Sequence, residues 1–312
     1  MDRLLTLAFW TATFSGGLRL ATPLVFASLG ETVSQRAGVL NIGIEGYMIV
    51  GALTALYTAV ETSVWFGFLV GGLAGMALSL VMVGLSLRMQ ANQVVVGFGL
   101  TIFGVGLTGY IFRLTNDVGS ARRSVGRMAP IDIPGISDIP FFGDAVLTNS
   151  WITWLGLACV PLVWWLSSRT TFGLQVRGAG EDPDAAAARG VKVVRVRALA
   201  TMLSGFFAGL GGAAISVGLV GVFEPNITAR RGFIALIVII MASWSPWGAA
   251  LGSFVFGFFE AFGTNLRNVV SDGVPTEALE AIPFLVALII LVVGARRARM
   301  PRSLGVNYQP DV

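Results

Sequence analysis

The sequence predicts an all-α, polytopic transmembrane bundle of about eight or nine helices, one of them broken, because several apolar runs are long enough to cross a bilayer. Composition supports this fold class. Hydrophobic residues make up 55% of the 312 residues and charged residues 12%, against about 25% charge in an ordinary soluble domain. Mean hydropathy is +0.79. So few charges cannot cover the surface of a soluble protein of this size, whereas a lipid-facing surface does not need them.

Each predicted span is an apolar run close to the roughly 20 residues that a bilayer core requires. The runs follow one another without a change in composition, so we expect one transmembrane domain over residues 1–312. The spans are 4–29, 42–60, 64–87, 92–112, 151–168, 198–222, a pair within 233–263, and 276–295.

The segment 233–263 is too long for one span and is interrupted by SWSPWG at 243–248. Proline removes a backbone donor and disfavours helix at the residue before it. We therefore expect a short helix over about 233–243, a turn and a second helix. Because unpaired backbone cannot face lipid, this broken or re-entrant helix is predicted to lie within protein.

Basic residues fall between the apolar runs, so topology explains the net charge of +4 better than nucleic-acid binding does. The loop 169–197, with five arginines and Lys192, is expected to be cytoplasmic, as is the arginine-rich C-terminal tail. Counting spans then places the N-terminus and the loop 113–150 outside. Basic residues usually lie on the cytoplasmic side of a membrane protein. Four arginines in or beside that outer loop do not follow this positive-inside rule, namely Arg113, Arg122, Arg123 and Arg127.

Several function classes are excluded by what the sequence lacks. It has no histidine and a single cysteine, Cys159, inside an apolar run. Disulfides, His/Cys metal sites and catalytic pairs that use histidine are therefore ruled out. No GxxxxGK[ST] phosphate loop is present. We expect no cofactor, no metal and no enzymatic activity in this chain, and an energy source on another polypeptide.

The segment GEDPDAAAARG at 180–190 predicts a short helix in the basic loop. Asp182 suits the N-cap, Pro183 the first helical position and Asp184 the positive end of the helix dipole. Gly190 ends the helix. A helix of about two turns is marginal alone in water, so its presence between two spans favours docking to a partner over a solvated connector.

The segment AGVLNIGIEG at 37–46 joins two apolar stretches and carries Asn41 and Glu45. A charge at bilayer depth costs about 2.5–3.5 kcal/mol on insertion scales, which argues for a functional role or a partner. Glu45 is predicted either to support a translocation pathway or to lie at the interface and pair with Arg36 or Arg19. The same two alternatives apply to Glu260, and for this residue a position at the membrane–water interface is favoured.

Four stretches together resemble the permease subunits of bacterial ATP-binding-cassette importers of the branched-chain-amino-acid/ribose type, and most closely the shorter permease of nucleoside ("simple sugar") importers. They are LRLATPLVFASLGETVSQRAGVLNIGIEG at 18–46, GEDPDAAAARG at 180–190, RRGFIALIVIIMASWSPWGAALGSFVFGFFEAFG at 230–263 and RRARMPRSLGV at 296–306.

The resemblance implies a type II importer-like bundle with a cytoplasmic helix that couples to an ATPase. It also implies three protein partners, namely a second, paralogous permease, a double-cassette ATPase that binds the ATP, and an extracytoplasmic substrate-binding protein. The setting would be the cytoplasmic (inner) membrane of a bacterium. The residues matching the coupling helix are Glu181, Asp182, Pro183, Asp184, Arg189 and Gly190.

A pathway role is implied for the segment around Asn41 and Glu45, and polar and aromatic groups elsewhere extend the candidate set. Ser243 and Trp244 are also candidates, at positions where relatives often have glycine, a basic residue and tryptophan, so this sequence departs from the family pattern there. The remaining candidates for the translocation pathway are Asn92, Gln93 and Phe98, for which plain helix packing is the competing interpretation.

The leading functional hypothesis is ATP-driven import of a nucleoside by alternating access. A monosaccharide or a branched-chain amino acid is the alternative solute. An ion-coupled secondary transporter would need midplane carboxylates in paired repeats, and no convincing inverted repeat is present. A membrane enzyme would need a polar catalytic constellation, which the sequence lacks.

Overall fold

The computed structural model describes residues 6–116, 123–126, 149–269, 281–286, 288–289, 292 and 299–309. These residues form a helical bundle, as predicted. The helices are α1 Leu7–Arg36, α2 Ile44–Glu61, α3 Val64–Met82, α4 Gln93–Thr115, α5 Trp151–Arg169, α6 Thr171–Glu181, α7 Pro183–Ala188, α8 Val193–Ala213, α9 Arg231–Met241 and α10 Pro246–Val269. Two of them continue as π-helical turns, α3 over Val83–Arg88 and α8 over Ala214–Val220.

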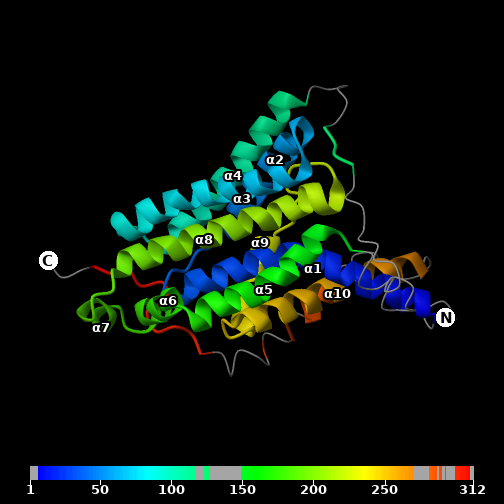
Figure 1. Cartoon of the computed structure of the whole chain (residues 1–312). Helices are drawn as coiled ribbons and strands as arrows, with labels where there is room; N and C mark the ends of the chain where they lie inside the picture. The colour runs from blue at the N-terminus through cyan, green and yellow to red at the C-terminus, as the bar shows by residue number, and fades with distance from the viewer. Residues whose placement is uncertain are drawn as a thin grey trace.

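Helices α1 and α8 form the centre of the bundle, with α5 and α10 alongside α1 (Figure 1). Four helices in the described chain are long and apolar enough to cross a membrane: α3 and α8 with their π-helical extensions, α4 and α5. In α8, 72% of the most apolar window is buried, whereas in α4 only 33% is. The outer helices therefore turn apolar side chains outward, as expected for a surface that meets lipid or another subunit.

Close contact between α3 and α8 depends on glycine. A Cβ added at Gly209 would lie 2.3 Å from the carbonyl oxygen of Gly71, and one added at Gly75 would lie 2.3 Å from the carbonyl oxygen of Gly205. Two backbones this close leave no room for side chains, which is how small residues serve helix packing in lipid. The GxxxG pair at Gly205 and Gly209 is therefore a packing seam.

The broken helix is confirmed. Helix α9 is only 11 residues long, and a turn at residues 242–245 leads into α10. In that turn Ser243 and Trp244 have φ of +49° and +57°, and Pro246 opens α10. Helix α10 then runs antiparallel to α1, because Ser253 lies near Ser28 and Asn265 near Thr13. Helix α9 thus enters the bundle and reverses within it.

The basic loop contains more helix than the sequence predicted. Residues 171–181 form the amphipathic helix α6, capped by the Thr170 hydroxyl, which accepts from the backbone N–H of Gly173. Helix α1 continues past the expected end at 29 to Arg36, and α8 begins at Val193. The prediction ended spans at ionisable residues, but the side chains of Glu31 and Arg197 form hydrogen bonds inside the protein.

Two predicted features lie mostly outside the described residues. The outer loop 113–150 is described only at its ends and at 123–126, where Val125 donates to the carbonyl oxygen of Gly221. The last predicted span, 276–295, is helical over residues 281–286.

Candidate functional site

Helix α7 lies at one end of the bundle, together with α6 and the described C-terminal segment 299–309 (Figure 1). This end is called the α7 end below. The Asp182 carboxylate accepts from the backbone N–H of Ala185 at 2.9 Å, Pro183 is the first helical residue, and Gly190 follows with φ of +84°. The predicted capped helix is therefore confirmed. Arg189 lies at its C-cap, and the side chains of Glu181, Asp182, Asp184 and Arg189 are exposed.

Arg197 holds the C-terminal segment to this end of the bundle. The residue is 1% exposed, and its guanidinium donates to the carbonyl oxygen of Val306 at 2.7 Å and to that of Ala179, in α6, at 3.1 Å. It also donates to the hydroxyl of Ser303, which in turn donates to the carbonyl oxygen of Gly180. A buried guanidinium is tolerated when such acceptors surround it, so α6, α8 and the tail are held as one unit.

The same tail reaches the segment 37–43 between α1 and α2. The backbone N–H of Gly305 donates to the carbonyl oxygen of Gly38. Gln93, at the start of α4, accepts from the backbone N–H of Leu40 at 2.8 Å and donates to Asn307 at 2.8 Å. Gln93, a pathway candidate, is therefore a buried link between α4, the tail and the segment 37–43.

A buried polar network crosses the bundle from this segment. The Glu31 carboxylate, on α1, accepts from the Ser204 hydroxyl of α8 at 2.6 Å, from the Gln35 amide at 3.1 Å and from the backbone N–H of Asn41 at 3.2 Å. Trp244 donates its indole N–H to Gln35 at 2.7 Å. The structure therefore brings two candidates, Asn41 and Trp244, into one network, with Glu31 between them.

Glu45 has a different partner from either arginine proposed for it. The residue is 3% exposed, and its carboxylate faces the N-terminus of α9. It accepts from the Thr228 hydroxyl, from the backbone N–H of Arg230 at 3.0 Å and from that of Gly232 at 2.7 Å. A carboxylate here satisfies helix N–H groups that have no partner within the helix and matches the positive end of the dipole. Of the two alternatives for Glu45, the pairing with Arg19 or Arg36 is not seen among the described residues.

Gly232 makes this arrangement possible. A Cβ at Gly232 would lie 2.6 Å from the backbone nitrogen of Glu45 and 2.9 Å from its carboxylate. The preceding residues Ala229 and Arg230 have φ of +47° and +64°, a region that residues with a side chain rarely adopt. The Glu45 carboxylate therefore holds a tight, strained turn from which the half-helix α9 starts.

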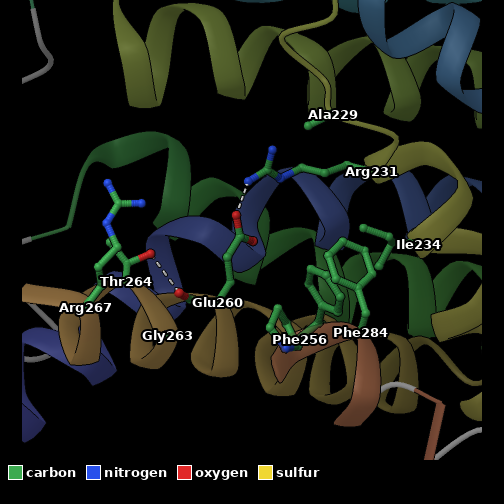
Figure 2. A pocket seen from close by; sticks show the side chains of 10 residues that line it. Ala229, Arg231, Ile234, Phe256, Glu260, Gly263, Thr264, Arg267 and Phe284 are labelled. Carbon is green, nitrogen blue, oxygen red and sulfur yellow. Dashed lines mark hydrogen bonds and ion pairs between the residues drawn. The ribbon is translucent and has the colours of Figure 1, made fainter. Parts of the chain in front are cut away.

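A cavity of about 320 Å³ opens beside that turn. Its polar feature is an ion pair between Arg231, the first residue of α9, and Glu260 of α10. Glu260 lies nine residues before α10 ends at Val269, and its side chain is 27% exposed. Figure 2 shows the two charged groups meeting while the rings of Phe256 and Phe284 lie together to one side.

Three further candidates do not join these buried groups. Asn92 is exposed and caps α4, accepting from the backbone N–H groups of Val94 and Val95. Phe98 is 47% exposed, with its ring 6.2 Å from that of Phe233. Ser243 is exposed in the turn after α9.

Sequence reasoning missed three residues that organise the site, namely Glu31, Arg197 and Arg231. Glu31 and Arg197 were assigned to loops because charge was taken to end a span. The signal that could have identified Glu31 is its place in the stretch 18–46, and for Arg231 it is the stretch 230–263, both of which carried the resemblance.

Comparison with known proteins agrees with a helical permease fold. The family described as "Branched-chain amino acid transport system / permease component" matches residues 13–293. No solved structure matches the chain.

Three curated relatives illustrate the range of solutes for which similar permeases are named. The putative glucose ABC transporter permease protein TsgC13 of Haloferax volcanii is 36% identical over 260 residues, covering 82% of this chain and 78% of its own. The guanosine ABC transporter permease protein NupQ of Bacillus subtilis is 30% identical over 298 residues, covering 92% and 93%. The nucleoside ABC transporter permease protein NupC of Lactococcus lactis subsp. cremoris is 29% identical over 301 residues, also covering 92% and 93%.

Proposed function

This chain belongs to the branched-chain amino acid transport system permease family, and from that premise we propose that its solute is a nucleoside. It is a multi-pass membrane permease of an ATP-binding-cassette importer. Two relatives named for guanosine or nucleosides align over 92% of the chain. A monosaccharide is the second candidate, because the relative named for glucose has the higher identity, 36%, although over a shorter stretch.

Uptake competition separates the two solutes. In cells that express the complete transporter, we expect accumulation of labelled guanosine that an excess of unlabelled guanosine abolishes and an excess of glucose leaves unchanged. Cells that lack this chain alone provide the background. Uptake of labelled glucose, unaffected by guanosine, would assign the transporter to monosaccharides instead.

The observation that carries the proposed mechanism is the capped helix α7, exposed between the spans α5 and α8. In the proposal α7 docks on a cytoplasmic ATPase, and closure of the ATPase on ATP moves α7 and α6. The end of α6 touches the end of α1, because a Cβ at Gly180 would lie 2.0 Å from the carbonyl oxygen of Arg36. Arg197 and the tail then carry the displacement to the segment 37–43 and to α9.

The proposed translocation pathway passes the buried candidates Asn41, Glu45, Gln93 and Trp244, which move with that segment in alternating access. The exposed candidates Asn92, Phe98 and Ser243 are assigned to the surface where a second permease packs. The apolar side chains of α4 suit that surface, since Ile102 is 72% exposed.

The proposed assembly has three other proteins. They are a paralogous permease, an ATPase that carries two cassettes and binds the ATP, and a substrate-binding protein that docks on the end opposite α7. We place the assembly in a bacterial cytoplasmic membrane, with the α7 end and the C-terminal tail in the cytoplasm.

Labelling of a single cysteine tests this orientation. In a Cys159→Ala background, an Ala188→Cys variant presents a thiol on the exposed face of α7. In inside-out vesicles from which the ATPase has been removed, so that it does not cover α7, we expect a membrane-impermeant maleimide to label this thiol, and we expect no labelling in intact cells. Labelling in intact cells would reverse the proposed topology.

A further inference from the structure

We propose that the cavity beside the N-terminus of α9 is a solute-binding site for a neutral molecule with adjacent hydroxyl groups and a flat apolar face. The inference rests on the proposed import function and deepens it by naming the recognition chemistry. The cavity has about 320 Å³, within the roughly 300–1,000 Å³ of small-molecule sites. Its lining comes from the turn before α9, from α9, from α10 and from residues 283–284.

The ion pair that lines the cavity has unused hydrogen-bonding capacity. Within the described part of the chain, Arg231 Nε and Glu260 Oε2 are buried and have no hydrogen-bond partner. Such atoms are uncommon in proteins and call for an explanation. One is a donor and the other an acceptor, although the two side chains already pair through Arg231 Nη2 and Glu260 Oε1.

A hydroxyl group fits this combination. It accepts from a guanidinium N–H and donates to a carboxylate oxygen, whereas a carboxylate or phosphate only accepts and an ammonium only donates. Two neighbouring hydroxyls, as in a ribose or a hexose, can therefore satisfy the donor and the acceptor together. The rings of Phe256 and Phe284, with centroids 5.6 Å apart, offer an apolar surface at the same cavity for a base or for the C–H face of a sugar.

The helix N-terminus next to the cavity does not offer an anion site. Such a terminus ordinarily favours phosphate or carboxylate, but the N–H groups of Arg230 and Gly232 already donate to Glu45. Arg267 also lines the cavity, two turns of α10 beyond Glu260, and it is exposed and has a partner of its own. The polar centre of the cavity is thus the Arg231–Glu260 pair, in which the two charges balance.

Protection of a cysteine tests the site without depending on transport. Thr264 lines the cavity, is exposed, and its hydroxyl donates to the carbonyl oxygen of Glu260 on its own helix. In the assembled transporter with Cys159→Ala, we expect guanosine and ribose to slow maleimide labelling of Thr264→Cys by several-fold, and leucine to have no effect. The matched control, Thr62→Cys in the exposed turn between α2 and α3, should label at the same rate with every solute.

Filling the cavity provides the second measurement. We expect Thr264→Phe to lose solute uptake while the assembled complex is still recovered from the membrane, and Leu251→Phe, on the outward face of α10, to retain uptake. Labelling of Thr264→Cys that no hydroxyl-bearing solute slows, or that leucine slows as strongly, would overturn the site. Protection by ribose or glucose without any guanosine uptake would keep the site and reject the nucleoside proposal.

Discussion

Reversing both acidic charges of α7, in the double variant Asp182→Arg and Asp184→Arg, should abolish uptake while the permease still inserts and assembles with its second permease. Asp182 caps the helix through the N–H of Ala185, and loss of such a cap costs about 1 kcal/mol. Two arginines would also oppose the positive end of the helix dipole. A helix of six residues has no other turn to stabilise it.

The measurement is labelled-solute uptake, together with the ATPase rate of the purified complex and its stimulation by solute-loaded binding protein. Asp182→Asn is the matched control, because asparagine caps a helix about as well as aspartate, and it should retain most of the uptake. Normal uptake by the arginine double variant would rule out α7 as the coupling element.

Most of the fold could be predicted from the sequence because lipid imposes strict rules on apolar runs. The broken pair α9 and α10 followed from one proline and from the length of the run, since 11 residues cannot cross a bilayer. The capped helix α7 followed from Asp182, Pro183 and Gly190, because capping is local and depends on residue type.

The three-dimensional partners could not be predicted in the same way. Glu45 is 183 residues from Thr228, and Glu31 is 173 from Ser204. No local pattern predicts which distant N–H or hydroxyl will meet a buried carboxylate. The prediction ended each span at the first ionisable residue, and this failed for α1 because Glu31 finds hydrogen-bond partners inside the bundle. Helix α6 was missed because its segment was assigned to the basic loop.

Glu45→Gln should strongly reduce both uptake and thermal stability, and Glu45→Ala should reduce them further. The carboxylate accepts three hydrogen bonds at the start of α9, and bonds to charged groups contribute about 1.5–3 kcal/mol each. Glutamine keeps one acceptor oxygen but turns an N–H₂ group toward donors, so at least one bond is lost. Alanine leaves the N–H groups of Arg230 and Gly232 without this acceptor, and that of Gly232 is buried.

The control is Glu61→Gln at the other end of α2, where the side chain is 71% exposed and its ion pair with Arg123 is long, at 3.8 Å. Exposed pairs of this kind contribute about 0–1 kcal/mol, so Glu61→Gln should match the wild type in uptake and in melting temperature. We expect the melting temperature to be highest for Glu61→Gln, lower for Glu45→Gln and lowest for Glu45→Ala. If Glu45→Gln were as stable and as active as the wild type, the carboxylate would not be what holds α9 in place. If Glu45→Gln lost uptake but kept the wild-type melting temperature, the carboxylate would not be needed to hold α9. The loss of uptake would then indicate direct contact between Glu45 and the solute.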